Sequence, residues 1–228
     1  MNRQNTIIIM PVYNEEQVVR EVIGDIKKYF EKIICVNDGS TDNSSNEIIG
    51  SKVILIEHPI NLGAGAATQT GIDYAIQNPD YQYFITIDAD GQHNIKDAVN
   101  MLDYLKKHKL DIVFGSRFIG NVENIGKIKR IFLKTAALFS YKTTKIKLTD
   151  PHIGLRVFNR EFAENLKLTL PDFTHASEVI RRVKEGHYNY AEFPVTITYS
   201  DYSKSKGQSM MNAINITIDL FLDRISKK

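Results

Sequence analysis

The chain has 228 residues, of which 43% are hydrophobic and 25% are charged, and its formal net charge is +2. These values are ordinary for a soluble globular protein and suffice for one good-sized core. The single cysteine, Cys35, excludes an internal disulfide and fits a reducing cytoplasm. No stretch approaches the ~18–20 apolar residues of a membrane-spanning helix, and the polar N-terminus predicts no signal peptide.

Short apolar runs alternate with helical patterns through the first half of the chain. The predicted strands cover residues 6–12, 32–37, 53–57, 83–87 and 111–115. Apolar residues at helical spacing predict helices at 18–30 and 95–105, and the small residues at 65–76 predict a third helix. Asn14 is a candidate N-cap of the first helix, with Gln17 as its capping-box partner. The alternation predicts an α/β fold on a mixed, mainly parallel sheet.

The second half continues with a predicted strand at 155–158, a helix at 177–185 and a late strand at 192–199. A polar stretch then precedes apolar residues that repeat at helical spacing over 211–225. We assign residues 1–200 to one domain, and residues 201–228 to a mobile loop and a C-terminal amphipathic helix. That helix could pack on the domain, form a homodimer or lie on a membrane, and its acidic residues favour protein packing.

Residues 124–149 form a basic segment that contains six lysines, Arg130 and no acidic residue. A basic segment on a near-neutral chain indicates an anionic partner, such as phosphate groups, an anionic membrane or nucleic acid, or else a solvated helix face. Its composition does not show the aromatic pattern of a nucleic-acid stacking platform. We therefore expect no nucleic-acid partner.

Two carboxylates, Asp88 and Asp90, follow the predicted strand at 83–87. Side chains alternate along a strand with a period of two, so the pair can point the same way from one sheet edge. Carboxylates held together repel each other unless a cation lies between them, and hard oxygen ligands suit Mg²⁺ or Mn²⁺. The pattern therefore indicates a diphosphate and cation site, although the same residues also suit a solvated turn.

Three further loops carry polar or glycine residues, at 11–15, 37–42 and 61–65. The first two follow predicted strands, and ligands of open α/β sheets bind at the carboxyl ends of the strands. The third opens a helix, where glycines allow a close backbone approach and the helix terminus favours anions. The glycine loop at 61–65 also fits a simple tight turn, and Asp38 and Asp42 also fit turn or N-cap positions, which is the simpler explanation for Asp42.

Taken together, five motifs occur in order at residues 11–15, 37–42, 88–93, 115–118 and 150–156. Their order and identity resemble the inverting GT-A-fold glycosyltransferases of family 2. Among these, the chain is most similar to the polyprenyl-phosphate glycosyltransferases of the dolichyl-phosphate mannose synthase type. The resemblance covers roughly residues 6–200 and implies a single Rossmann-like nucleotide-binding domain.

The resemblance implies a nucleotide-sugar donor, a UDP- or GDP-sugar, and Mg²⁺ or Mn²⁺ as cofactor. The residues that it places in the nucleotide pocket are Pro11, Tyr13, Glu15, Asp38, Gly63, Asp88 and Ala89. Asp38 would hydrogen-bond the base. Asp88 would lie at the ribose, the diphosphate and the metal, and Asp90 and Gln92 would ligate the metal.

On the acceptor side, the resemblance implies that Arg117 and Arg130 face a phosphate. It makes Asp150 a candidate catalytic carboxylate and Glu178 a second one. A lipid phosphate is largely anionic near pH 7, because its second pKa is ~6, so it needs cations more than a base. A sugar hydroxyl would instead need a base to remove its proton. The basic segment favours a polyprenyl phosphate acceptor. Transfer to a hydroxyl of a growing cell-surface glycan, and a silent nucleotide-sugar-binding module, stay open.

Three features depart from the family pattern. Ala64 stands where members often carry a lysine, the chain has no tryptophan, and it stops at Lys228 without the transmembrane helices of many relatives. The missing tryptophan removes the motif of processive synthases, so a single transfer is implied. We therefore expect a cytoplasmic protein that meets the inner face of the membrane peripherally, or through a membrane-protein partner.

Overall fold

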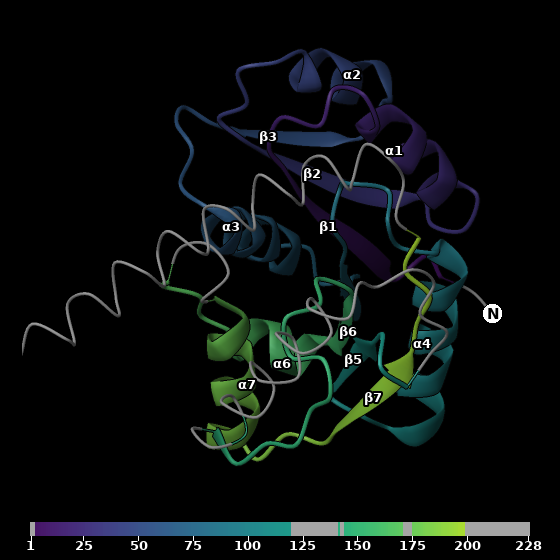
Figure 1. Ribbon diagram of the computed structural model, residues 1–228, viewed down its shortest axis with the longest axis vertical. Helices are drawn as coiled ribbons and strands as arrows, with labels where there is room; N and C mark the ends of the chain where they lie inside the picture. The colour runs from purple at the N-terminus through teal and green to yellow at the C-terminus, as the bar shows by residue number, and fades with distance from the viewer. Residues whose placement is uncertain (1–2, 120–140, 142–143, 171–174, 199–228) are drawn as a thin grey trace, which may run out of the picture.

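The computed structural model describes residues 3–119, 141, 144–170 and 175–198. These residues form a seven-stranded sheet with helices on both faces (Figure 1). The strands are β1 (Thr6–Val12), β2 (Lys32–Asp38), β3 (Ile54–His58), β4 (Tyr83–Thr86), β5 (Ile112–Ser116), β6 (Arg156–Asn159) and β7 (Tyr190–Pro194). The helices are α1 (Val19–Lys27), α2 (Ser44–Gly50), α3 (Ala64–Ile76), α4 (Ile95–His108), α6 (Arg160–Asn165) and α7 (His175–Glu185).

The strand order is β3-β2-β1-β4-β6-β5-β7. Of the strands described, β6 alone runs antiparallel to its neighbours, and the other pairs are parallel. The carboxyl ends of six strands therefore lie at one sheet edge together with the amino end of β6. The chain proceeds outward from β1 through β2 to β3 and then returns to β4 on the other side of β1, so β1 and β4 flank the topological switch point where ligands bind.

Alternation along the strands divides the core into two layers. In β1, Ile8 and Met10 pack with α1, α2 and α4, whereas Ile7 and Ile9 pack with α3, α6 and α7. All four side chains are buried. The near-continuous apolar composition of β1 and β2 thus follows from burial on both sheet faces. The rigid sheet between two helix layers holds the loops at its edge in fixed positions.

The predicted strands and helices of the first half are all confirmed, with bounds that shift by three residues or fewer. The sequence did not predict the short helices α2 and α6. The capping box is wrong: α1 begins after Val18 without a side-chain cap. Asn14 instead adopts a left-handed conformation, with φ of 54°, and its side-chain oxygen accepts from the backbone N–H of Thr41 at 2.8 Å.

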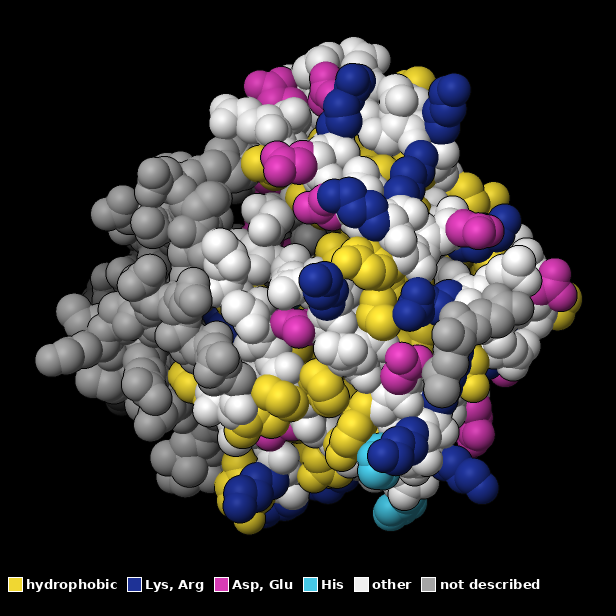
Figure 2. All heavy atoms as spheres, turned by 90° about the vertical axis from the view of Figure 1, so that its right-hand side faces the viewer, with side chains coloured by type: hydrophobic (Ala, Val, Ile, Leu, Met, Phe, Trp, Pro, Cys, Tyr) yellow, Lys and Arg dark blue, Asp and Glu magenta, His cyan; other side chains and the backbone are white. Residues whose placement is uncertain are grey.

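Most of the predicted basic segment, Arg130 included, and the predicted helix at 211–225 lie outside the described residues. On the face covered by α1 and α4, Lys and Arg side chains are interspersed with Asp and Glu side chains (Figure 2). Within the described ranges, no helix is both long enough and apolar enough to cross a bilayer.

Candidate active site

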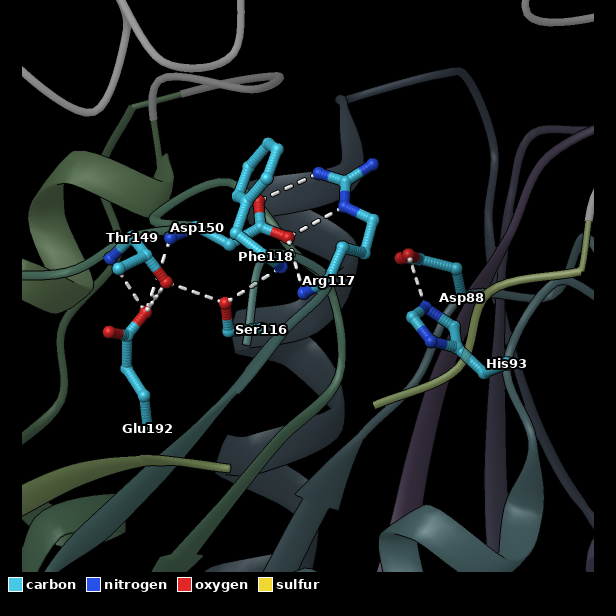
Figure 3. Close-up of polar contacts among 8 residues, drawn as sticks. All are labelled: Asp88, His93, Ser116, Arg117, Phe118, Thr149, Asp150 and Glu192. Atoms are coloured by element: carbon cyan, nitrogen blue, oxygen red, sulfur yellow. Dashed lines mark hydrogen bonds and ion pairs between the residues drawn. The ribbon is translucent and has the colours of Figure 1, made fainter. Parts of the chain in front are cut away.

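The carboxylate pair lies where β4 ends, as the sequence predicted. Asp88 Oδ2 contacts His93 Nε2 at 3.0 Å (Figure 3). Asp90 accepts hydrogen bonds from the backbone N–H of Gln92 at 3.1 Å and from its Nε2 at 2.6 Å. The Gln92 amide would therefore have to turn to present its oxygen to a cation bound by Asp90.

The two carboxylates differ in electrostatic environment. Desolvation and the negative charge of Asp88 raise the pKa of Asp90 to about 6, and Glu15 adds to this effect. Desolvation acts on Asp88 too, but the hydrogen bond from His93 and the charges of His93 and Arg156 outweigh it and lower the pKa of Asp88. The negative charge gathered here is what a divalent cation neutralises, so the donor set fits a hard metal ion.

The backbone at Gly154 closes one side of this acidic loop. Thr86 Oγ1 donates to the Gly154 carbonyl oxygen at 2.8 Å. A Cβ atom at position 154 would overlap the Asp88 carboxylate. A glycine is therefore required here to let the chain pass beside Asp88.

Across the edge, Arg117 and Asp150 form a bidentate ion pair. Arg117 Nε lies 2.6 Å from Asp150 Oδ2, and Arg117 Nη2 lies 2.7 Å from Oδ1 (Figure 3). The backbone N–H of Arg117 also donates to Oδ2 at 3.1 Å. The Asp150 side chain is 1% exposed and that of Arg117 is 12% exposed. Asp150 would have to break this pair before it could accept a proton from a substrate.

Glu192 of β7 fixes the loop that carries Asp150. Its Oε1 accepts from the backbone N–H groups of Thr149 and Asp150 at 2.7 and 3.2 Å, and from the Thr149 hydroxyl at 2.9 Å. Thr149 Oγ1 in turn lies 2.6 Å from Ser116 Oγ at the end of β5 (Figure 3). These hydrogen bonds therefore connect Ser116 of β5 and Glu192 of β7 to the segment that precedes β6, at residues 149–150.

Arg156 is a second cation of the site, at the start of β6. It is 3% exposed, and its Nε has no hydrogen-bond partner among the described residues. Burial lowers the pKa of Arg156 to about 10, although the charges of Asp88 and Asp150 oppose this shift. Its position opposite Thr86 in β4 and Phe114 in β5 places it between the acidic loop and the Arg117–Asp150 pair.

The remaining wall of the site consists of two interlocked loops. The backbone N–H of Asn14 donates to Ser40 Oγ at 2.9 Å, and that of Glu15 donates to Ser44 Oγ at 2.8 Å. Tyr13, in the same loop, is 43% exposed. These contacts join the loop after β1 to the loop after β2.

The topology brings most of the predicted site residues to one edge: Pro11, Tyr13, Glu15, Asp38, Gly63, Asp88, Ala89, Asp90, Gln92, Arg117 and Asp150. Glu178 lies in α7 and accepts from the backbone N–H groups of Thr169 and Leu170, both at 2.8 Å. Desolvation would raise the pKa of Glu178, but hydrogen bonds from Thr169 and Leu170 hold it below its usual value. These contacts anchor the loop at 169–170, and the catalytic role of Glu178 stays a prediction.

Sequence reasoning assigned no role to His93, Arg156 and Glu192. His93 and Arg156 do stand within two of the five motifs, so the motifs contained a signal for them. Glu192 stands in a predicted strand, and its contacts with residues 149 and 150 depend on tertiary structure alone.

A three-layer fold with this sheet order and this edge is that of a GT-A glycosyltransferase. The model of Glycosyl transferase family 2 matches residues 7–167, which is more than half of the chain. The protein therefore belongs to this family and is a glycosyltransferase.

Two curated relatives and one solved structure illustrate the similarity. UDP-N-acetylglucosamine–dolichyl-phosphate N-acetylglucosaminyltransferase of Methanococcus voltae is 27% identical, over 96% of both chains. Polyprenol monophosphomannose synthase of Mycolicibacterium smegmatis is 26% identical over 96% of this chain and 85% of its own. Glucosyl-3-phosphoglycerate synthase of Mycobacterium tuberculosis, solved with Mn²⁺, UDP and glucosyl-3-phosphoglycerate, has a TM-score of 0.67 at 15% identity, covering 86% of this chain and 72% of that one. At that identity the structure supports the fold alone.

Replacing Gly154 with alanine is expected to lower the rate of glycosyl transfer at least tenfold, because the added methyl group displaces the Asp88 carboxylate. Overpacking of this kind also costs about 1–3 kcal/mol of stability. Gly24→Ala is the matched control, because open space surrounds that helical position. Steady-state kinetics and thermal unfolding of both variants check this, and unchanged turnover in Gly154→Ala would show that Asp88 need not hold its position.

Proposed function

We propose that the protein transfers a single sugar, with inversion, from a UDP- or GDP-sugar to a polyprenyl phosphate at the cytoplasmic face of a membrane. The observation that carries this proposal is the division of one sheet edge into an acidic half and a cationic half. Asp88 and Asp90 form the acidic half. Arg117 lies across the edge in its pair with Asp150, and Arg156 lies between the two. Two anionic substrates, a diphosphate with its cation and a phosphate, match these two halves.

The acidic half suits the donor. Within the described residues, no group of three His, Cys, Asp or Glu side chains could hold a metal ion by itself. Asp90, Asp88 and a turned Gln92 would therefore share the ion with the donor diphosphate. A bound Mg²⁺ or Mn²⁺ stabilises the negative charge that develops on the leaving diphosphate. A solved protein with the same fold holds Mn²⁺ and UDP.

The cationic half suits a phosphate acceptor. Arginine binds phosphate oxygens through its planar fork of N–H donors. Arg156 has a buried N–H without a partner in the described residues. The fork of Arg117 is bound by Asp150, so Arg117 would have to leave this pair before it could bind a phosphate. Because Asp150 is held by Arg117, a base-assisted attack by a sugar hydroxyl is the less favoured alternative. One curated relative is named a dolichyl-phosphate N-acetylglucosaminyltransferase and the other a polyprenol monophosphomannose synthase, which supports a lipid acceptor.

The experiment measures release of nucleotide by the full chain from a panel of UDP- and GDP-sugars with Mn²⁺, with and without a short polyprenyl phosphate. We expect metal-dependent release that the lipid phosphate stimulates. Turnover that ignores the lipid but responds to a glycan acceptor would favour the hydroxyl alternative. A chain that binds no donor would be a silent module.

Metal affinity is expected to depend on pH through Asp90. Because the pKa of Asp90 is about 6, protons compete with the cation below that value. In the presence of UDP, the affinity for Mn²⁺ should be nearly constant above about pH 6. Below about pH 6 it should fall by up to about tenfold for each pH unit. Isothermal titration between pH 5 and 8 measures this. Any pH dependence of Mn²⁺ affinity that persists in Asp90→Asn arises from the nucleotide phosphate. Identical pH profiles for the unmodified protein and Asp90→Asn would contradict the prediction.

A further inference from the structure

One stretch of chain, formed by the last residues of β7 and the four residues that follow, contacts both halves of the site. We call it the 192–198 segment. In the sheet, β6 and β5 separate β7 from β4. The segment passes the ends of these two strands and reaches the loop after β4 beside the start of α4 (Figure 1). It is therefore placed to set the distance between the acidic and the cationic half.

At one end of the segment, Glu192 orients a chain of hydrogen bonds in the cationic half. A carboxylate only accepts, so the Thr149 hydroxyl donates to Glu192, and the Ser116 hydroxyl must donate to Thr149 at 2.6 Å (Figure 3). Ser116 Oγ in turn accepts from the backbone N–H of Phe118 at 3.2 Å. Glu192 thus determines the direction of each of these hydrogen bonds, as far as the residue that follows Arg117.

At the other end, backbone N–H groups fix the segment to the acidic half. The N–H of Thr196 donates to Asp97 Oδ2 at 2.7 Å, and Asp97 lies in the first turn of α4. The N–H of Thr198 donates to the carbonyl oxygen of Gln92 at 2.9 Å. The backbone of Gln92 is therefore held by the segment, whereas its side-chain amide can still turn toward a cation.

Between these ends, the segment is bound to the sheet and to the core. The backbone N–H of Val195 donates to the carbonyl oxygen of Ser116 at 3.1 Å. Ile197 forms an antiparallel bridge with His93. The side chains of Val195 and Ile197 are both buried in the core layer that contains α1 and α4. Hydrogen bonds and buried side chains therefore hold the segment from the cationic half to the acidic half.

We propose that Glu192 and Asp97 are positioning residues, which align the acceptor half and the donor half through the 192–198 segment. The proposal rests on the proposed function. Inversion requires the acceptor to approach the sugar from the side opposite the leaving diphosphate, so the two halves need the correct separation as well as the correct charges. Each carboxylate acts by accepting hydrogen bonds from the loops that carry the site residues.

The two roles predict different kinetic effects. Glu192→Ala removes the acceptor of the N–H groups at 149–150, and should raise the KM for a short polyprenyl phosphate about tenfold without changing the affinity for Mn²⁺ and nucleotide. Asp97→Ala releases the stretch that holds Gln92, and should weaken the binding of Mn²⁺ with UDP or GDP about tenfold without changing the KM for the lipid phosphate. The kcat should fall in both variants, because transfer depends on alignment.

The conservative variants distinguish positioning from a general loss of stability. Glu192→Gln and Asp97→Asn keep an acceptor oxygen and should restore most of each loss. Glu192→Asp withdraws the oxygen by one methylene, so it should show the same selective rise in KM even if Glu192→Ala does not fold. Glu185→Ala, at a half-exposed carboxylate of α7, is the matched control and should behave like the unmodified protein.

Steady-state transfer by the full chain, isothermal titration with Mn²⁺ and nucleotide, and amide hydrogen exchange measure these effects. Exchange should rise at residues 149–150 in Glu192→Ala and at residue 196 in Asp97→Ala. Unchanged exchange there, equal losses toward both substrates in each variant, or amide variants as impaired as the alanine variants would overturn the positioning roles. Absence of transfer to the lipid phosphate by the unmodified protein would overturn the proposed function, while nucleotide binding and hydrogen exchange would still decide the role of Asp97.

Discussion

Replacing Asp90 with asparagine is expected to abolish metal-dependent transfer while making the metal-free protein more stable at neutral pH. The loss should be about 10²–10³-fold or more, since a metal ion contributes several kcal/mol of charge stabilisation in the transition state. The gain in stability arises because desolvation and the charge of Asp88 raise the pKa of Asp90 to about 6. Holding this carboxylate ionised in the folded protein therefore costs free energy, which asparagine does not incur.

The sign follows from linkage between protonation and folding. A carboxyl group whose pKa is higher in the folded state stabilises the folded protein at pH values below its unfolded-state pKa. For Asp90, this contribution is lost as the pH rises through about 6. Asp90→Asn should thus raise the free energy of unfolding at pH 7.5 by about 1–3 kcal/mol and by almost nothing at pH 4. Urea unfolding in a chelator measures both values. Asp80→Asn, at an exposed position, is the matched control. A destabilised Asp90→Asn at pH 7.5 would contradict the electrostatic description of the site.

Replacing Arg117 with alanine should cost about 3–5 kcal/mol of stability, because it leaves the Asp150 carboxylate buried without its charged partner. The double variant Arg117→Ala with Asp150→Asn removes both charges and should recover most of that loss. Denaturant unfolding of the two single variants and the double variant forms a complete cycle. A loss below about 1 kcal/mol in Arg117→Ala would place the pair among exposed salt bridges of little energetic weight.

The same variants separate the two acceptor chemistries. If Arg117 binds an acceptor phosphate, the refolded double variant still transfers poorly, and its KM for the lipid phosphate rises. If Asp150 acts as a base toward a hydroxyl, Asp150→Asn alone removes transfer. We expect Asp150→Asn to retain most of its activity with a phosphate acceptor. A drop above about 10²-fold with that acceptor would favour the base, since general base catalysis contributes about that much or more.

The sequence predicted the acidic half of the site well and the cationic half less well. Asp88 and Asp90 follow a parallel strand directly, so strand periodicity and the edge rule locate them. The pair of Arg117 and Asp150 joins residues 33 positions apart. Arg117 directly follows β5, and Asp150 precedes the antiparallel strand β6. Local patterns carry no information on such a pairing.

Tertiary contacts determine the surroundings of two polar residues that local patterns single out. Asn14 has the composition of an N-cap, yet its contact with the loop after β2 holds it in a left-handed conformation. Asp38 fits a base contact by resemblance, but its bonds to Leu62, Gly63 and His58 depend on how β2, β3 and α3 meet. In both cases tertiary contacts decide what a polar side chain does.

The most direct measurement is mass spectrometry of the lipid product formed from a UDP-sugar, Mn²⁺ and a short polyprenyl phosphate, beside the matched polyprenol without phosphate. We expect a product in which one sugar is joined to the phosphate, no product from the polyprenol, and no product with Asp90→Asn. A sugar attached to the polyprenol, more than one sugar per lipid, or equal product with Asp90→Asn would contradict this expectation.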